Sequence, residues 1–274
     1  MSCYVNGTFT SKGNATLSPF DLGFLRGLGM FDTLRTYNRR PLFLEQRLSR
    51  FEKGAAELGI TLKEERKNLP GIIHSLIENT PEEELIIRII ATLGDTEDGF
   101  TPSGKSTLLI LTSPFHAEEW ETTTPIDTIT IKAARVCPQV KTLNYLPAAK
   151  ALHNSKGVEE ALYVNEKGEL LEGTRSNFFA LKEGKLITAS KEIYQGFTRH
   201  LLLEKATSDM TVEFRAPHVD EIHTFEEAFL TASLRGIVPV GTIDGKSIHG
   251  KQIGPKTKEL KQLLRQVFFE LALN

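Results

Sequence analysis

The stretch QVKTLNYLPAAK (residues 139–150) places a single lysine, Lys141, between two elements of different kinds. The preceding stretch, TPIDTITIKAARV (124–136), is rich in alternating β-branched residues and predicts a strand. The following stretch, residues 145–155, predicts a helix. A lysine at such a joint is either an ordinary solvated side chain or an amine that forms an imine with a carbonyl group. The choice between the two depends on the rest of the chain.

Composition and charge restrict the class of protein. The 274 residues can bury a sizeable core, as one large domain or two modest ones. A net charge of −2 gives no basic excess that would attract nucleic acid or an anionic membrane. The two cysteines, Cys3 and Cys137, predict neither a disulfide framework nor a metal cluster. Because the start lacks a signal-peptide pattern and no apolar run approaches about 18 residues, we expect a cytoplasmic protein.

The pattern of elements predicts an α/β (α+β) protein of two domains, 1–115 and 126–274. The first part combines a hairpin around residues 37–40, an amphipathic helix from Glu45, a second helix near 71–78 and two short apolar strands. The polar stretch 116–125 is typical of an interdomain linker. Beyond it come glycine-turn hairpins, a helix from Thr198 and a terminal helix whose apolar face holds Leu260, Leu263, Leu264, Val267, Phe268 and Leu271.

One motif is misleading. The stretch GFTPSGKS (99–106) fits the phosphate-loop pattern of nucleotide-binding proteins. Such a loop must leave a strand and open a helix, but the stretch is followed by TLLILT (107–112), which predicts a strand. We therefore interpret residues 99–106 as a connection between two strands.

Three further stretches give Lys141 a chemical context. In ELLEGTRSNFF (169–179), Glu172 ends a strand. The stretches YQGFTRHLLLEKA (194–206) and FLTASLRGIVPV (229–240) offer backbone amides and hydroxyl groups, which suit a phosphate dianion. A carboxylate for a pyridine nitrogen, an amine that forms an imine and a phosphate site are together what pyridoxal phosphate requires.

These residues resemble the class IV (fold-type IV) pyridoxal-phosphate aminotransferases, which include branched-chain and D-amino-acid transaminases and have aminodeoxychorismate lyase as a sister activity. The resemblance covers nearly the whole chain and rests on five motifs in the family's order: RLSRF (47–51), KTLNY (141–145), LEGTRSNFF (171–179), GFTR (196–199) and TASLRGIVPV (231–240). It implies the two-domain fold-type IV architecture, with a smaller N-terminal domain, a larger C-terminal domain and the cofactor between them.

The resemblance also implies roles for single residues. Lys141 would form the Schiff base with the cofactor and then move a proton as a base, and Glu172 would keep the pyridine nitrogen protonated. Tyr145 would stand near the cofactor, although its position equally suits a helix residue packed on the core. The phosphate would be bound by Arg50 and by two turns, formed by Phe197, Thr198, Ala232 and Ser233.

Arginines are the residues that bear on the substrate. Arg88 lies in an almost wholly apolar run, where a buried guanidinium needs an anion, which is either a substrate carboxylate or an internal acidic residue. The resemblance implies that Arg26 lies on a loop that reaches the partner subunit's active site in a homodimer, and that Arg175 faces the same pocket as Glu172. Three arginines at one site would favour a substrate with one or two carboxylates.

The resemblance leaves three reactions open. Bacterial D-amino-acid transaminases carry a tyrosine where this chain has Phe31 and an arginine–histidine pair that is not evident here. Arginines at positions 26 and 175 are most similar to a non-canonical group of D-amino-acid transaminases. We therefore expect transfer of the amino group of a D-amino acid, of the D-Glu, D-Ala or D-Asp type, to a 2-oxo acid. The alternatives are 4-amino-4-deoxychorismate lyase and a branched-chain L-amino-acid aminotransferase.

Overall fold

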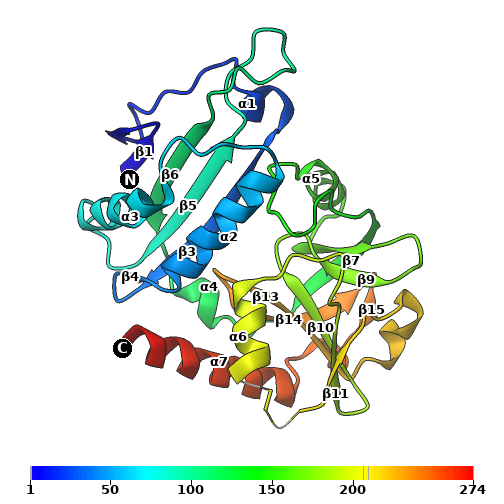
Figure 1. Ribbon diagram of the computed structural model, residues 1–274. Helices are drawn as coiled ribbons and strands as arrows, with labels where there is room; N and C mark the ends of the chain where they lie inside the picture. Colours follow the sequence, from blue (N-terminus) through cyan, green and yellow to red (C-terminus); the bar gives the residue numbers. More distant parts are fainter. Residues whose placement is uncertain (1, 206, 209, 274) are drawn as a thin grey trace. The chain divides into compact units, whose positions relative to one another are not determined.

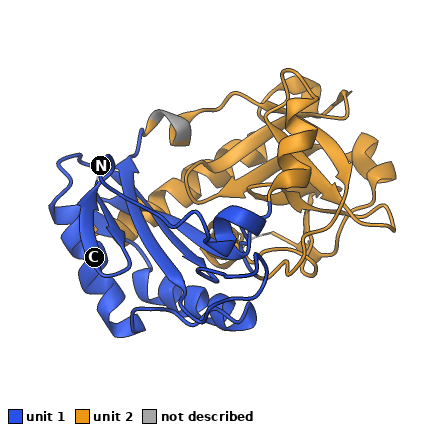
Figure 2. Ribbon diagram, turned by 90° about the horizontal axis from the view of Figure 1, so that it is seen from above, with its two compact units in different colours: residues 1–116, 140–144 blue, residues 117–139, 145–274 orange. Residues whose placement is uncertain are grey.

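The computed structural model describes the chain except for residues 1, 206, 209 and 274 and the side chains of residues 118 and 119. The chain forms two compact units, coloured separately in Figure 2. Unit 1 contains residues 1–116 and 140–144, and unit 2 contains residues 117–139 and 145–274. Residues 140–144, which the sequence analysis assigned to the C-terminal domain, thus group with the N-terminal unit.

Unit 1 is built on an antiparallel sheet of six strands in the order β2-β1-β6-β5-β3-β4. Its helix α2 runs beside β3 (Figure 1) and buries Leu48, Phe51 and Ala55 on one stripe. The hairpin between β3 and β4 turns at Asn38 and Arg39, whose left-handed backbone is typical of a tight hairpin. The bounds of the strands and helices are β1 Ser2–Val5, β2 Thr8–Ser11, α1 Leu22–Arg26, β3 Gly29–Tyr37, β4 Arg40–Pro41, α2 Leu44–Glu57, η1 Arg66–Asn68, α3 Leu69–Glu78, β5 Leu85–Thr92 and β6 Thr107–Pro114.

The stretch 99–106 lies between β5 and β6 and opens no helix, which confirms that it is a strand connection. In β5 the side chains alternate between two environments. Leu85, Ile87 and Ile89 are buried, whereas Arg88 is exposed. The expectation of a buried guanidinium at Arg88 was therefore wrong, because the apolar run is buried on one face only.

Unit 2 is built on nine strands in the order β12-β11-β10-β13-β14-β7-β8-β9, with β15 paired to β14. A further pairing between β9 and β10 closes the sheet on itself, and aliphatic and aromatic side chains fill the interior. The elements are α4 Glu118–Glu121, β7 Ile126–Lys132, α5 Leu146–His153, β8 Glu160–Val164, β9 Leu170–Gly173, β10 Asn177–Lys182, β11 Lys185–Thr188, α6 Phe197–Lys205, β12 Val212–Phe214, η2 Val219–Thr224, β13 Glu227–Ala232, β14 Gly236–Ile243, β15 Lys246–Ser247, η3 His249–Lys251 and α7 Pro255–Leu273.

Two segments of unit 2 differ from the sequence-based expectations. The stretch 116–125 is not wholly extended, because it contains the short helix α4, whose Trp120 is buried and packs edge-to-face on Phe268 with 5.2 Å between ring centroids. The terminal helix α7 buries Leu260, Leu264 and Phe268 but leaves Leu263 exposed. Among the described residues, no helix has both the length and the apolar composition that crossing a membrane requires.

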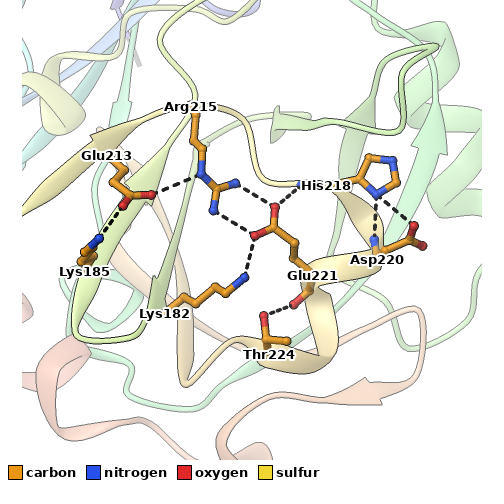
Figure 3. Close-up of polar contacts among 8 residues, drawn as sticks. All are labelled: Lys182, Lys185, Glu213, Arg215, His218, Asp220, Glu221 and Thr224. Carbon is orange, nitrogen blue, oxygen red and sulfur yellow. Dashed lines mark hydrogen bonds and ion pairs between the residues drawn. The ribbon is translucent and has the colours of Figure 1, made fainter.

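An ion-pair network ties η2 to β10 and to the segment after β12 (Figure 3). Its centre is Glu221, whose carboxylate accepts two hydrogen bonds from the guanidinium of Arg215, at 2.7 and 2.9 Å, and one from Lys182 at 2.8 Å. The backbone amide of His218 adds a fourth, at 2.8 Å. Hydrogen bonds from Arg215, followed by those from Lys182 and the His218 amide, outweigh burial and hold the pKa of Glu221 well below its usual range.

This network predicts a pH-dependent contribution to stability. Replacement of Glu221 by Gln should lower the free energy of unfolding by about 1 kcal/mol at neutral pH. Because the pKa of Glu221 is lowered on folding, its contribution is present above the unfolded-state pKa of about 4.3 and is lost as the pH falls below it. Chemical denaturation of wild type and Glu221→Gln should thus converge in acid. The exposed neighbour Asp220, replaced by Asn, is the control; equal stability of Glu221→Gln and wild type at neutral pH would contradict the prediction.

Candidate active site

Strand β3 of unit 1 holds the segment that carries Lys141. The backbone amide of Phe31 donates to the carbonyl of Lys141 at 2.8 Å, and the amide of Leu143 donates to the carbonyl of Gly29 at 2.9 Å. Val140 is buried beside α2. These contacts fix the backbone on both sides of Lys141, which explains why a short piece of the chain from the middle of unit 2 belongs to unit 1.

A buried carboxylate, Asp32, lies beside the Lys141 amine. Its oxygen atoms are 3.6 Å from Nζ of Lys141 and 2.7 Å from Nη2 of Arg50, and its side chain is 3% exposed. Burial alone would raise the pKa of Asp32, but the positive charges of Arg50 and then Lys141 outweigh it and lower the pKa to about 2. The centroid of the Phe31 ring lies 5.9 Å from Nζ of Lys141. Unit 1 thus brings together the predicted residues Lys141, Arg50 and Phe31.

Sequence reasoning missed Asp32. The signal was present, since FDTLR (31–35) puts an acidic residue inside a strand that is otherwise largely buried. A buried carboxylate requires a cationic or hydrogen-bonding partner, so such a residue indicates a polar site.

A second buried carboxylate, Glu172, lies at the end of β9 in unit 2. It accepts hydrogen bonds from Nδ2 of Asn177 at 3.1 Å and from the Tyr194 amide at 3.2 Å, and Nε of Arg135 lies 2.8 Å from it. Arg135 also donates to the Tyr145 hydroxyl at 3.4 Å. Burial disfavours the guanidinium charge, but Glu172 and then Tyr145 outweigh it and raise the pKa of Arg135.

Arg135 and Asn177 are thus further site residues that sequence reasoning did not identify. Arg135 follows β7 in a stretch of small residues, and nothing in its local sequence indicates a partner 37 positions later. Asn177 stands inside the quoted motif LEGTRSNFF but carries no charge that would have drawn attention to it. The predicted pair of Glu172 and Tyr145 is brought together through Arg135.

Two buried threonine hydroxyls lie in the segments of unit 2 that were predicted to bind phosphate. Thr198 lies in the first turn of α6, after Phe197, and Thr231 lies near the end of β13, followed by Ala232 and Ser233. Both threonines are 2% exposed, and neither hydroxyl has a hydrogen-bond partner among the described residues. Buried hydroxyls without partners are costly, and a helix N-terminus favours an anion. A phosphate oxygen is a suitable acceptor for such a hydroxyl, so the predicted residue Thr198 fits the cofactor that the sequence implies, and Thr231, two residues before the predicted Ser233, is a further candidate that the sequence analysis did not name.

The three arginines expected to contact substrate lie in different settings. In unit 1, Nε of Arg26 donates to the Gly99 carbonyl at 3.1 Å, and Arg88 is exposed on β5. In unit 2, the Arg175 side chain is 56% exposed and lies 3.4 Å from the buried carboxylate of Glu160. The charge of Arg175 is therefore partly neutralised by Glu160, but the side chain is accessible to a ligand. No described contact brings Arg26 and Arg88 together.

Each unit provides side chains that match chemical groups of pyridoxal phosphate. Unit 1 provides an amine beside a buried acid and a half-buried guanidinium. Unit 2 provides a buried carboxylate held by Asn177, Tyr194 and Arg135, and two buried threonine hydroxyls without a hydrogen-bond partner among the described residues. An amine, a carboxylate and an anion site are the groups that bind the carbonyl, the ring nitrogen and the phosphate of pyridoxal phosphate.

Comparison with known proteins agrees with this chemistry. The chain is 30% identical to a putative branched-chain-amino-acid aminotransferase of Methanocaldococcus jannaschii, over 97% of this chain and 96% of that protein. It is 25% identical to a D-alanine aminotransferase of Staphylococcus aureus, over 94% and 95% of the two chains. It is 27% identical to an aminodeoxychorismate lyase of Bacillus subtilis, over 96% and 93%.

A solved structure gives the same fold. The branched-chain aminotransferase of the archaeon Thermoproteus uzoniensis, crystallised with norvaline, superposes with a TM-score of 0.88 at 20% identity and covers 99% of this chain and 95% of its own. The fold is thus the mixed α/β fold of the fold-type IV enzymes. The family model for amino-transferase class IV matches residues 29–243. The chain belongs to the class IV aminotransferases, which are pyridoxal-phosphate enzymes.

Proposed function

We propose that this chain transfers the amino group of a D-amino acid, of the D-Glu, D-Ala or D-Asp type, to a 2-oxo acid, with Lys141 as the covalent anchor of pyridoxal phosphate. The observation that carries the cofactor role is the Lys141 amine beside the buried Asp32 carboxylate, within a chain that belongs to the class IV aminotransferases. The cofactor, when bound, supplies an electron sink for the bond broken at the substrate Cα.

The lysine has two tasks in this proposal. Its Nζ holds the cofactor at rest, and it carries a proton to and from the substrate once it is free. Asp32, 3.6 Å away, offers a fixed negative charge that orients the amine. Arg50 and then Lys141 outweigh burial and hold the pKa of Asp32 well below the neutral range, so Asp32 is a negative charge there.

The remaining predicted residues hold the cofactor. Glu172, fixed by its three partners, would keep a proton on the ring nitrogen, and Arg135 would orient Tyr145 toward the same ring. The phosphate would be bound by Arg50, whose planar guanidinium suits a bidentate contact, and by the turns at Phe197–Thr198 and Ala232–Ser233.

Two arginines and one of the relatives support a D-amino acid as the substrate. Arg175 follows Glu172 by three residues and could take a carboxylate, because its side chain is 56% exposed while the Glu160 carboxylate keeps it in place. Arg26, anchored on Gly99, would take a second carboxylate. The D-alanine aminotransferase of S. aureus, similar over 94% of this chain, supports a D-amino acid donor.

A branched-chain L-amino acid is the second candidate. Its support is the 30% identity to the putative branched-chain enzyme and the Phe31 ring, whose centroid is 5.9 Å from Nζ of Lys141 and which would suit an aliphatic side chain. The lyase reaction is a third candidate, supported by the relative of B. subtilis.

We further propose a homodimer in which the segment that carries Arg26, at the end of α1, completes the site of the partner subunit. Phe24 of α1 and Phe100, next to the Gly99 that Arg26 contacts, are 80% and 72% exposed, as expected of residues that a partner covers. Analytical ultracentrifugation should show a dimer, and Phe24→Ser should shift it toward monomer with loss of turnover. A fully active monomeric wild type would contradict this arrangement.

The donor is tested by the visible absorption of the purified protein. Addition of D-glutamate or D-alanine should convert the absorption band of the bound cofactor, and a 2-oxo acid should restore it. Conversion by L-leucine but not by the D-amino acids would establish the branched-chain reaction instead. Release of pyruvate from 4-amino-4-deoxychorismate, with no response to either class of amino acid, would establish the lyase.

Replacement of Arg175 by Ala tests the carboxylate contact. Loss of a charge-assisted hydrogen bond should raise KM for the amino donor about 10- to 100-fold, with the affinity for the cofactor unchanged. Arg265→Ala is the matched control, since Arg265 is 66% exposed and pairs with a surface carboxylate of its own. If Arg175→Ala weakens cofactor binding and leaves KM unchanged, Arg175 does not bind substrate.

A further inference from the structure

The side chain of Asn177 connects two parts of unit 2 that are distant in the sequence. It is the first residue of β10, is 4% exposed and pairs in register with Glu172 of β9 on one side and Thr231 of β13 on the other. Its Nδ2 donates to Glu172 at 3.1 Å and to the Tyr194 carbonyl at 2.6 Å, and its Oδ1 accepts from the Gly196 amide at 3.2 Å.

Only an amide satisfies these three partners. Glu172 and the Tyr194 carbonyl are acceptors, so the NH₂ group must face them, while the Gly196 amide is a donor and requires the carbonyl oxygen. This orientation is therefore fixed by the partners. An aspartate at position 177 would set a carboxylate against Glu172 and against a backbone carbonyl.

Gly196 packs closely against the Asn177 side chain. A Cβ atom at this position would collide with Oδ1 of Asn177, so a larger residue forces the amide to move. Gly196 also accepts the first hydrogen bond of α6, from the amide of His200 at 3.0 Å. The position of the helix N-terminus, with Thr198, is thus tied to the same amide that holds Glu172.

We propose that Asn177 is a positioning residue that fixes the Glu172 carboxylate and the N-terminal turn of α6 relative to each other. One amide then sets the spacing between the group for the ring nitrogen and the group for the phosphate of pyridoxal phosphate. This inference rests on the roles proposed above for Glu172 and Thr198.

The first test is the affinity of the apoenzyme for pyridoxal phosphate. Asn177→Ala should raise the dissociation constant about 10- to 100-fold, because hydrogen bonds to a charged partner and to the turn are both lost. It should also weaken the binding of inorganic phosphate, used as a probe of the proposed phosphate site without the pyridine ring, and change the visible circular dichroism of the bound cofactor. Asn177→Asp should also bind pyridoxal phosphate less tightly than the wild type. The difference between the two should be smallest at low pH, where the new carboxyl group can carry a proton and donate a hydrogen bond.

Asn165 provides the matched control. Its Nδ2 also donates to a carboxylate, Glu169, at 2.7 Å, within a surface turn of the same unit. Asn165→Ala should leave the affinity for pyridoxal phosphate and for inorganic phosphate unchanged, even where it lowers the unfolding temperature.

A double-mutant cycle separates positioning from a general loss of folding. Gly196→Ala alone should weaken pyridoxal phosphate binding, because its Cβ displaces the Asn177 amide. In the double variant Asn177→Ala/Gly196→Ala the collision is absent, so the second substitution should add about twofold or less to the loss caused by the first. Additive losses, or unchanged binding in Asn177→Ala, would overturn the inference alone. Failure of the wild type to bind pyridoxal phosphate would overturn the proposed function with it.

Discussion

The burial of two carboxylates is the constraint on which the site depends. Asp32 and Glu172 are 3% and 2% exposed as side chains, and a charge removed from water must be met by cations or donors. Unit 1 meets Asp32 with Arg50 and Lys141, and unit 2 meets Glu172 with Arg135, an amide side chain and a backbone amide. Each unit thus fixes a group for cofactor chemistry by satisfying its own buried charge.

The same requirement explains the architecture around each carboxylate. Glu172 can be reached by a side chain of β10 only because β9 and β10 pair where the sheet closes. Lys141 can reach Asp32 only because its segment leaves the sequence of unit 2 and pairs with the start of β3. The fold positions the chemistry through pairings between distant segments, which is why the family retains the fold while relatives carry the names of different reactions.

The sequence predicted the fold class and the family because these depend on local motifs and periodicity. The burial of a single side chain depends on which face of a helix or strand is covered. Arg88 and Leu263 were therefore predicted to be buried, but both are exposed. Arg135 could not be predicted because its partner Glu172 is 37 positions away in the sequence, whereas Asp32 was missed although an acidic residue within a largely buried strand indicates a polar site. The reaction depends on the depth and charge of the substrate pocket. The class IV motifs are shared by relatives named for different reactions, so they do not distinguish between these reactions.

The central claim is that Lys141 is the residue that anchors pyridoxal phosphate. Borohydride reduction of the purified holoenzyme, followed by peptide mapping with mass spectrometry, tests it most directly. We expect a phosphopyridoxyl group on the peptide that contains Lys141 and on no other lysine peptide. Stoichiometric labelling of a different lysine, or a holoenzyme that reduction leaves unlabelled, would contradict it.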